Sequence, residues 1–309
     1  MKTYLVTGGA GFIGSHLVDA LLTTGQHVVV LDDLSSGKRE NVSSEANLVV
    51  GNVRDRTLVT SLMEEVDGCF HLAAVPSVVR SHQDWRDTHT VNLTGTVTVL
   101  EAARSTPKRR AIPVVFASSA AVYGDNPNAP LKEDAITRPL SAYGADKLGS
   151  ELHARVGGAV HGIPTLGLRL FNVFGPRQDP HSPYSGVISQ FVERAQQGME
   201  LIIHGDGMQV RDFVYVFDVV RFFVRAIECS APDGQVVNVC TGHPITIRDL
   251  AGAVISLTGN RSSCIHTETR AGDIRVSIGS PEHAAQYLGL RAETNLHTGL
   301  KTILEHARR

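Results

Sequence analysis

The chain has 309 residues, of which 42% are hydrophobic and 19% are charged, and its net charge is −2. This length suffices for a full hydrophobic core, and the balanced charge argues against a nucleic acid or a membrane surface as the main partner. The first apolar run is too short for a signal peptide or a membrane span, so we expect a cytoplasmic protein.

The chain opens with a predicted strand at Thr3–Thr7, a glycine-rich turn and a predicted helix that starts near Ser15. The turn contains four glycines, Gly8, Gly9, Gly11 and Gly14. The last three fit the spacing of a dinucleotide-binding turn, and a wider register includes the first. Side chains at these positions would keep a pyrophosphate away from the backbone N–H groups at the helix N-terminus.

The next predicted strand, His27–Leu31, ends in Asp32 and Asp33, about 20 residues after the glycines. A carboxylate at this place accepts hydrogen bonds from both ribose hydroxyls of an adenosine and repels a 2′-phosphate. We therefore predict NAD rather than NADP as the cofactor. The plain alternative is a glycine-rich turn beside a solvated acidic pair. The order of strand, glycines, helix, strand and acid favours the cofactor site.

Strands and helices alternate over the rest of the first half. We expect strands at 47–50, 69–74, 113–117 and 164–170, and helices around 58–63, over 84–103 and after 141. This alternation predicts an α/β fold with a Rossmann-like, doubly wound parallel sheet. Ligands bind at the carboxyl ends of such strands, where the polar loop 34–39 and the pair Ser118-Ser119 are expected.

Tyr143 and Lys147 lie four residues apart on the helix that opens after Ser141, so they share one helix face. A nearby positive charge, here the Lys147 ammonium together with the nicotinamide of oxidised NAD, favours the phenolate and lowers the pKa of a tyrosine, which is about 10 in isolation. Tyr143 is thus a candidate base near neutral pH. Such a pair alone would be mostly chance on a solvated helix. The dinucleotide motif and Ser118-Ser119 before it favour a catalytic site.

Beyond Leu170 the regular alternation decays. We expect helices at 187–197, 218–228 and 247–257 and short strands at 201–203 and 212–214. This predicts a smaller, mixed α/β C-terminal lobe. The expected domains are an NAD-binding domain over residues 1–170 and a mainly substrate-binding lobe over 171–309, with segments that pack back on the first domain.

The chain has four scattered cysteines, Cys69, Cys229, Cys240 and Cys264, and its 14 histidines are dispersed. No cysteines have C-x-x-C spacing, which indicates neither a zinc site nor a disulfide framework. We expect reduced cysteines in the core and no metal.

The chain resembles the extended short-chain dehydrogenase/reductase family, and within it the nucleotide-sugar 4-epimerases. The matching segments are 7–14, 32–33, 71–74, 118–119, 122–124, Tyr143 with Lys147, 171–177, 205–207, 211–213 and 270–273. The resemblance covers essentially the whole chain, and motifs in this order are specific.

The resemblance implies a bound NAD that is reduced and reoxidised within each turnover. Tyr143 would take the proton from the sugar 4-hydroxyl, Lys147 would hold the nicotinamide ribose, and Ser119 would bond the 4-oxygen. The other residues implied to contact NAD are Gly8, Gly11, Phe12, Ile13, Gly14, Asp32, Asp33, Ser36, Gly37, Asn52, Val53, Leu72, Ala73, Ala74, Asn92 and Phe171.

The implied substrate is a UDP-sugar, and arginine suits its diphosphate because the guanidinium donates two parallel hydrogen bonds. The implied contacts are Asn172, Arg211 and Arg270 at the diphosphate, Asp273 at the nucleotide ribose, Tyr184 and Val187 around the base, and Ser77, Ser119 and Ser277 at the sugar.

Ala120 and Ala121 stand where the family's dehydratases carry an Asp-Glu pair and its UDP-glucuronate decarboxylases keep the glutamate. Without a carboxylate there, oxidation and re-reduction at C4 is the supported reaction. Ser277 stands where the family limits the sugar's 2-substituent, and a small residue admits an N-acetyl group. We expect a UDP-galactose/UDP-glucose 4-epimerase that also accepts UDP-N-acetylhexosamines.

Two alternatives stay open: a UDP-glucuronate 4-epimerase and a non-catalytic NAD-binding regulator. The intact set of Ser119, Tyr143 and Lys147 argues against the regulator. The resemblance also implies a homodimer formed through the helices that begin near Asp84 and Ser141.

Overall fold

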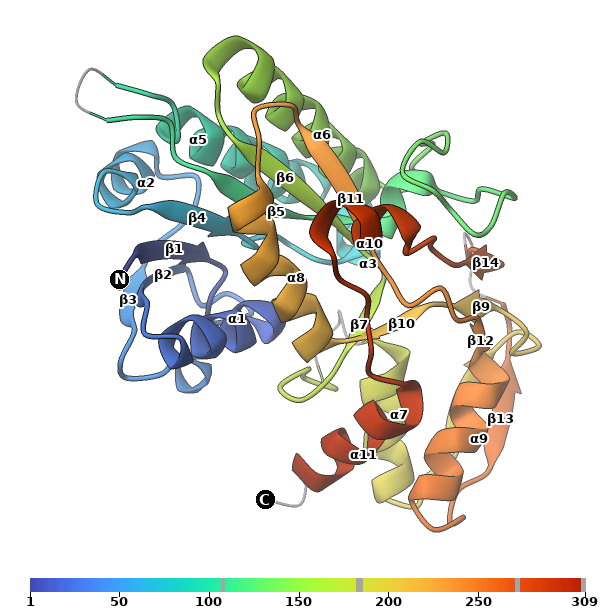
Figure 1. Ribbon diagram of the computed structural model, residues 1–309. Coiled ribbons are helices and arrows are strands. Elements are labelled where there is room, and N and C mark those ends of the chain that lie inside the picture. Colours follow the sequence, from blue (N-terminus) through green and yellow to red (C-terminus); the bar gives the residue numbers. More distant parts are fainter. Residues whose placement is uncertain (107–108, 182–185, 270–272, 307–309) are drawn as a thin grey trace.

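The structure is a computed structural model that describes residues 1–106, 109–181, 186–269 and 273–306. Figure 1 shows a larger body built on a twisted sheet, which contains the N-terminus, and a smaller body that contains α7, α9 and α11. The structure confirms the predicted α/β class with a Rossmann-like sheet.

The described residues form a seven-stranded sheet in the order β11-β6-β5-β4-β1-β2-β3, and every neighbouring pair is parallel. All carboxyl ends therefore lie at one edge. The strands are β1 (Thr3–Thr7), β2 (His27–Asp32), β3 (Asn47–Val50), β4 (Gly68–His71), β5 (Val114–Ser119), β6 (Thr165–Leu170) and β11 (Gln235–Val239).

Helices cover both faces of this sheet, so its central strands are apolar on both sides. Along β1, Tyr4 and Val6 pack toward α1 and α8, whereas Leu5 packs toward α2 and α5. The bounds are α1 (Phe12–Thr23), α2 (Arg56–Met63), α3 (Val78–Gln83), α4 (Trp85–His89), α5 (Gly95–Ala102), α6 (Ala142–His161) and α8 (Val216–Cys229), with a 3-10 turn at Arg39–Asn41 and another at Ala120–Tyr123.

The long helix predicted over 84–103 is observed as a continuous helical segment over 85–102, but it contains a π-helical turn that was not predicted. The segment divides into α4, one π-helical turn at Thr90–Thr94, and α5. Asp84 caps α4 by accepting a hydrogen bond from the Asp87 N–H. Asn92 lies in this π-helical turn. Its side-chain amide accepts a hydrogen bond from the Val75 N–H and donates one to the Val75 carbonyl, in the segment that follows β4.

The smaller lobe is built from short strands and three helices that share an apolar core among the described residues, including Phe174, Phe191, Leu250 and Leu300. Its pairs are β7 with β10, β8 with β13, and β9 with β12 and β14. The elements are β7 (Asn172–Phe174), α7 (Val187–Gln196), β8 (Leu201–His204), β9 (Val210–Arg211), β10 (Phe213–Tyr215), β12 (Ile245–Thr246), α9 (Ile247–Leu257), β13 (Cys264–Thr267), β14 (Val276–Ser277) and α11 (Leu296–His306).

Strand β11 was not predicted. It pairs with β6 and completes the main sheet, while α8 and α10 (Glu282–Leu288) also pack on the main body. The boundary after residue 170 remains a prediction, as does the function of the lobe that follows it.

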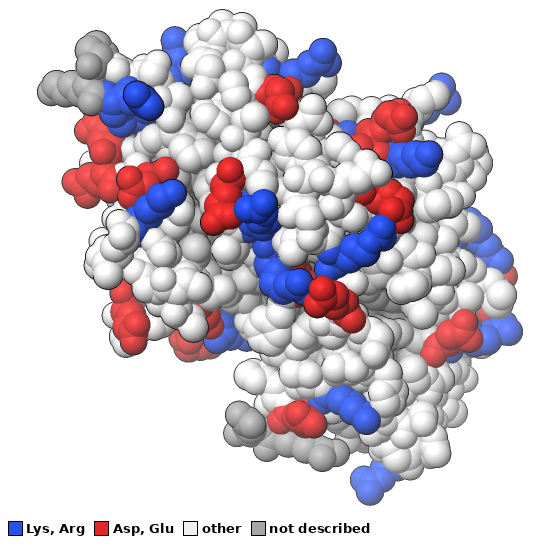
Figure 2. Space-filling view, viewed as in Figure 1, with Lys and Arg blue, Asp and Glu red and all other residues white. Residues whose placement is uncertain are grey.

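The four cysteines are free, as expected, but they are not all in the core. Cys69 and Cys240 are buried, whereas Cys264 on β13 is exposed because this strand lies at the surface of the smaller lobe. Figure 2 shows Lys and Arg interspersed with Asp and Glu on the face in view. In the part of the chain that the structure describes, no helix is both long enough and apolar enough to span a membrane.

Candidate active site

The glycine turn between β1 and α1 is closely packed against backbone atoms, both its own and those of the segment after β4. Gly8 has φ of +72°, and a Cβ there would lie 2.7 Å from the Ala73 nitrogen. A Cβ on Gly14 would lie 2.2 Å from the Gly8 oxygen. Such contacts leave no room for a side chain. The turn therefore needs glycine to close, even before any ligand approaches the N-terminus of α1.

The adjacent carboxylates Asp32 and Asp33 have different surroundings. Asp32 is buried, and its Oδ2 and Oδ1 accept hydrogen bonds from the N–H groups of Ala10 and Leu34, each at 2.9 Å. Burial raises the pKa of Asp32, and these hydrogen bonds oppose that rise. Asp32 thus braces the glycine turn.

Asp33 is exposed at the end of β2, and its Oδ2 accepts a hydrogen bond from Asn52 Nδ2 at 2.7 Å. It is the more exposed of the two carboxylates. The loop after it packs on the glycine turn, since Lys38 N–H bonds the Ala10 oxygen and a Cβ on Gly37 would lie 2.9 Å from Ala10. Ser36 in this loop is exposed.

His71, at the carboxyl end of β4, ties several elements together. Its ring nitrogens lie 2.7 Å from Thr7 Oγ1 on β1 and 3.0 Å from Thr96 Oγ1 on α5. Ser150 on α6 donates to the same Thr96 oxygen. Burial, and secondarily the charge of Lys147, lowers the pKa of His71 to about 3, so the ring is neutral. This structural link was not predicted from the sequence.

Ser119, Tyr143 and Lys147 converge at the end of β5. Ser119 Oγ accepts a hydrogen bond from the Ala121 N–H and also bonds the side chain of Tyr143. Lys147 Nζ lies 5.8 Å from the centre of the Tyr143 ring and donates to the Ala117 carbonyl at 2.7 Å. Ser141 caps α6 through its Oγ and so sets where this helix begins.

The expected depression of the Tyr143 pKa, which included the charge of an oxidised nicotinamide, stays a prediction. Burial raises the pKa of Tyr143, and the Ser119 hydrogen bond opposes but does not reverse that rise. The ammonium group of Lys147 lies over the ring and donates a hydrogen bond to the Ala117 carbonyl. Burial also lowers the pKa of Lys147 to about 8, against the charge of Asp146.

The remaining residues predicted to contact NAD follow the same sheet edge. Phe12 and Ile13 begin α1, and Leu72, Ala73 and Ala74 follow β4, all of them half-buried. Other side chains are occupied by protein contacts: Val53 and Phe171 pack in the core, and Asn92 Oδ1 accepts a hydrogen bond from the Val75 N–H at 2.7 Å. Their contact with NAD remains a prediction.

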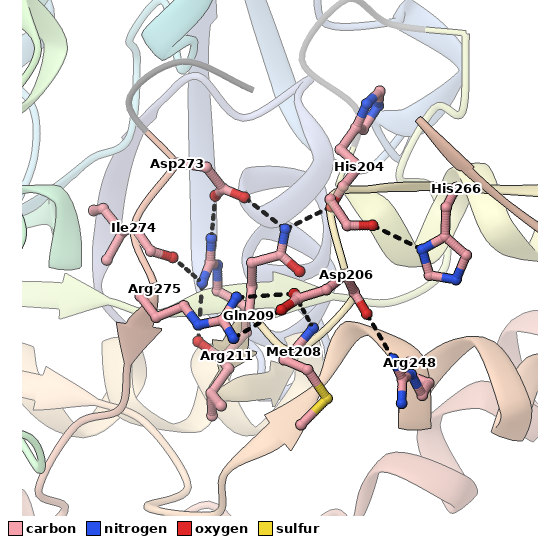
Figure 3. A network of polar contacts seen from close by, with 12 residues as sticks. His204, Asp206, Met208, Gln209, Arg211, Arg248, His266, Asp273, Ile274 and Arg275 are labelled. Atoms are coloured by element: carbon pink, nitrogen blue, oxygen red, sulfur yellow. Dashed lines mark hydrogen bonds and ion pairs between the residues drawn. The ribbon is translucent and has the colours of Figure 1, made fainter. Parts of the chain in front are cut away.

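On the substrate side, Arg211 and Asp273 bind each other (Figure 3). Arg211 Nη2 lies 2.5 Å from Asp273 Oδ1, and its Nη1 donates to the Ile274 carbonyl at 2.7 Å. Gln209 Nε2 holds the other Asp273 oxygen at 3.0 Å. Burial lowers the pKa of Arg211, and Asp273 opposes this. The structure brings together the two residues that the resemblance assigns to the diphosphate and the ribose.

The other predicted substrate residues lie on different elements and differ in their exposure. Asn172 is exposed on β7, Val187 begins α7, and Ser277 on β14 pairs with Arg211 on β9. Ser77 is buried, and its Oγ caps α3 by accepting from the Arg80 N–H at 3.0 Å. The remaining two predicted residues, Tyr184 and Arg270, lie outside the described residues.

A buried polar network behind Ser119 was not predicted. Arg169 on β6 donates to both oxygens of Glu151 on α6, at 2.9 and 2.8 Å, and to Tyr123 at 2.8 Å. Ser118 Oγ donates to Glu151 as well. The sequence held one signal of this network: Arg169 is a charged residue inside an otherwise apolar strand, and a buried charge needs a partner. The network joins α6 to β5 and β6 immediately beside the converging side chains.

Comparisons with known proteins show the family. A model of the NAD dependent epimerase/dehydratase family matches residues 4–240. UDP-glucose 4-epimerase from Mycolicibacterium smegmatis is 39% identical over 314 residues, covering 100% of this chain and 99% of that protein. The crystal structure of UDP-glucose 4-epimerase from Thermotoga maritima with UDP-glucose has a TM-score of 0.94 at 36% identity, covering 99% of this chain and 98% of that chain.

UDP-N-acetylglucosamine 4-epimerase from Methanobrevibacter ruminantium, in complex with UDP-N-acetylmuramic acid, is also similar. Its TM-score is 0.92 at 33% identity, covering 99% of this chain and 98% of that chain. The similarity to proteins with these two substrate names extends over essentially the full length of the chain.

Proposed function

The chain belongs to the NAD-dependent epimerase/dehydratase family and is an NAD-dependent UDP-sugar epimerase, and we propose that it interconverts UDP-glucose and UDP-galactose and also accepts UDP-N-acetylhexosamines. The observation that carries the proposal is the convergence of Ser119, Tyr143 and Lys147 at the sheet edge beside the glycine turn.

The residues at the first turn fit NAD. Within the described residues the N-terminus of α1 has no side-chain cap, so its first N–H groups are available to a pyrophosphate. A Cβ on Gly14 would fill the close approach that shapes the turn. Asp33 offers an exposed carboxylate to the adenosine ribose. When bound, NAD would accept a hydride from the sugar and return it.

The side chains of this chain supply the acid and the base. Tyr143 takes the proton of the sugar 4-hydroxyl and later returns it, while the Ser119 hydroxyl holds the 4-oxygen. The Lys147 ammonium favours the phenolate form of Tyr143 and is present below a pH of about 8, because its pKa lies there. Epimerisation rather than dehydration is supported by Ala120 and Ala121, which cannot transfer a proton at C5 or C6.

The sugar preference is proposed from Ser277. It lies beside Arg211 in the register of β14 with β9, and its short side chain would leave space at the sugar's 2-substituent. The similarity to an N-acetylglucosamine epimerase supports the broader range. UDP-glucuronate remains the alternative sugar.

A homodimer is also proposed. Large apolar side chains are exposed at successive turns of α6, with Leu152 56%, Val156 54% and Val160 67% exposed, and Trp85 on α4 is 68% exposed. Side chains four residues apart form a continuous stripe on a helix. A second copy of the chain would cover this stripe and form a four-helix contact. Light scattering of the purified protein tests this, and a monomeric mass would contradict it.

The function is tested by proton NMR of the purified protein with UDP-glucose or UDP-N-acetylglucosamine, first without and then with added NAD. We expect the anomeric signals of both galacto products. Turnover of only one sugar would define the preference of the Ser277 position. No turnover of either sugar with NAD present would overturn the proposal, and UDP-glucuronate would be the next substrate to test.

A further inference from the structure

We infer that Asp212 is a positioning residue of the substrate site: its buried carboxylate fixes Arg211, Asn172 and Ser277 relative to the main sheet. These three residues bind the UDP-sugar in the proposed function, on which the inference rests. Binding of UDP alone can be measured without turnover, so the two are tested separately.

The carboxylate of Asp212 is buried, and both of its oxygens are bonded. The residue is 0% exposed. Its Oδ1 accepts hydrogen bonds from the Thr241 N–H at 2.8 Å and from Thr241 Oγ1 at 2.7 Å. Its Oδ2 accepts from the N–H groups of Gly242 at 2.9 Å and Gly279 at 3.3 Å. A buried carboxylate is costly unless it is hydrogen-bonded, so these four donors hold it in one place.

The donors come from two segments that are distant in the chain. Thr241 and Gly242 follow β11, at the carboxyl edge of the main sheet, whereas Gly279 follows β14 of the smaller lobe. Asp212 itself lies between β9 and β10. One side chain therefore joins the edge of the main sheet to two segments of the smaller lobe.

The residues on either side of Asp212 pair with predicted substrate residues. Arg211 lies opposite Ser277 in the register of β9 with β14, and Phe213 lies opposite Asn172 in the register of β10 with β7. The Asp212 carbonyl also accepts a hydrogen bond from the Asn172 N–H at 3.0 Å. The positions of Arg211, Asn172 and Ser277 thus depend on the same short segment.

Asp212 acts on Arg211 through the backbone. The Arg211 side chain reaches Asp273, whereas the Asp212 side chain reaches Thr241, because consecutive side chains of an extended segment point to opposite faces. In the main sheet β11 lies beside β6, and β6 lies beside β5, which ends at Ser119. The carboxylate therefore fixes the predicted substrate residues relative to the catalytic side chains without touching the ligand itself.

The first test is Asp212→Asn, which keeps the volume of the side chain. The amide oxygen can still accept from Thr241, but the amide nitrogen is a donor that faces the N–H groups of Gly242 and Gly279. Both N–H groups lose their acceptor, so the segments after β11 and β14 should move apart. Kd for UDP and KM for UDP-glucose should each rise by about tenfold, while kcat stays within about twofold and NAD is retained.

UDP binding is measured by titration calorimetry of the protein–NAD complex, and KM and kcat are measured from initial rates. Both measurements are made well below the Tm of each variant, so that a loss of stability alone does not change them.

Thr241→Val and Thr241→Ser form a second, milder pair. Valine removes the hydroxyl that donates to Asp212 and that accepts from the His243 N–H at 3.0 Å, whereas serine keeps both contacts. Kd for UDP should rise by about two- to threefold in Thr241→Val and stay unchanged in Thr241→Ser. This pair decides the question if Asp212→Asn does not fold. Equal Kd values for the two variants would then overturn the inference.

Asp218→Asn is the matched control. Asp218 on α8 is also buried, 3% exposed, and accepts from the Thr294 N–H at 2.9 Å and from Arg221 at 3.1 Å. Its substitution should lower Tm but leave Kd for UDP and KM unchanged. If Asp212→Asn also lowers Tm and leaves both constants unchanged, Asp212 has only a structural role and the inference is overturned.

Failure of the proposed function gives a different result. If Kd for UDP rises in Asp212→Asn but not in Asp218→Asn, while the unsubstituted protein turns over no UDP-sugar, the inference stands and the proposed function fails. If the unsubstituted protein does not bind UDP, both are overturned.

Discussion

The glycine turn of the main sheet and the arginine–aspartate cluster of the smaller lobe hold their polar groups differently. At the turn, Asp32 and the backbone bond each other and leave the first N–H groups of α1 and the Asp33 carboxylate available. In the smaller lobe, Arg211 and Asp273 occupy each other. In the proposed function, the cofactor side is therefore preformed, whereas the substrate side would exchange an internal ion pair for contacts with the ligand.

The largest effect is expected at Tyr143, where the two sides meet. Tyr143→Phe should lower turnover by about 10²–10⁴-fold because the proton at the sugar 4-oxygen loses its acceptor. NAD binding and Tm should stay unchanged, since the ring remains. Tyr287→Phe is the matched control, because its hydroxyl bonds the Cys229 carbonyl far from the site. Turnover by Tyr143→Phe near that of the control would exclude Tyr143 as the base.

A substitution that distorts the glycine turn should affect both the stability of the fold and the retention of NAD. Gly14→Ala places a Cβ 2.2 Å from the Gly8 oxygen, so the turn must move. We expect the free energy of unfolding to fall by about 1–3 kcal/mol, as for other overpacked sites, and NAD to be lost on gel filtration. Gly252→Ala on α9 meets nothing within 4 Å and should be neutral or stabilising. Equal Tm values for the two variants would refute a close-packed turn.

A substitution in the Arg211–Asp273 pair should affect substrate binding alone. Arg211→Lys removes the planar fork, and KM for UDP-glucose should rise about tenfold, since a hydrogen bond to a charged group contributes about 1.5–3 kcal/mol. NAD retention should not change. Arg248→Lys is a nearby control, because this arginine bonds the Asp206 carbonyl instead (Figure 3). A rise in KM for both variants alike would show that Arg211 has no special contact.

The smallest expected effect on UDP-glucose turnover is at Ser277, which concerns the sugar alone. Ser277→Tyr should abolish turnover of UDP-N-acetylglucosamine and leave that of UDP-glucose within a few-fold, because only the larger 2-substituent needs the space. The ratio of the two kcat/KM values in one variant measures this directly. An unchanged ratio would show that another residue limits the size of the sugar's 2-substituent.

The sequence predicted best what depends on local patterns. Apolar runs bounded by glycine and polar residues predicted the first six strands of the sheet, and the glycine spacing predicted the turn at Gly8 and Gly14. Interactions between distant segments were not accessible. Nothing local distinguishes braced Asp32 from exposed Asp33, or pairs Arg169 with Glu151. The rise in the Tyr143 pKa that burial causes was not predicted, because spacing does not reveal burial.

Strand β11 has a consequence for how the protein is made. Its residues 235–239 pair with β6, which ends at Leu170, so most of the smaller lobe is synthesised between the two partners. While the ribosome adds those residues, β6 remains an open edge with unpaired backbone groups, the kind of edge that recruits other chains. We therefore expect a chain that ends before residue 235 to expose this edge, and the two halves not to be exchangeable between relatives as independent modules.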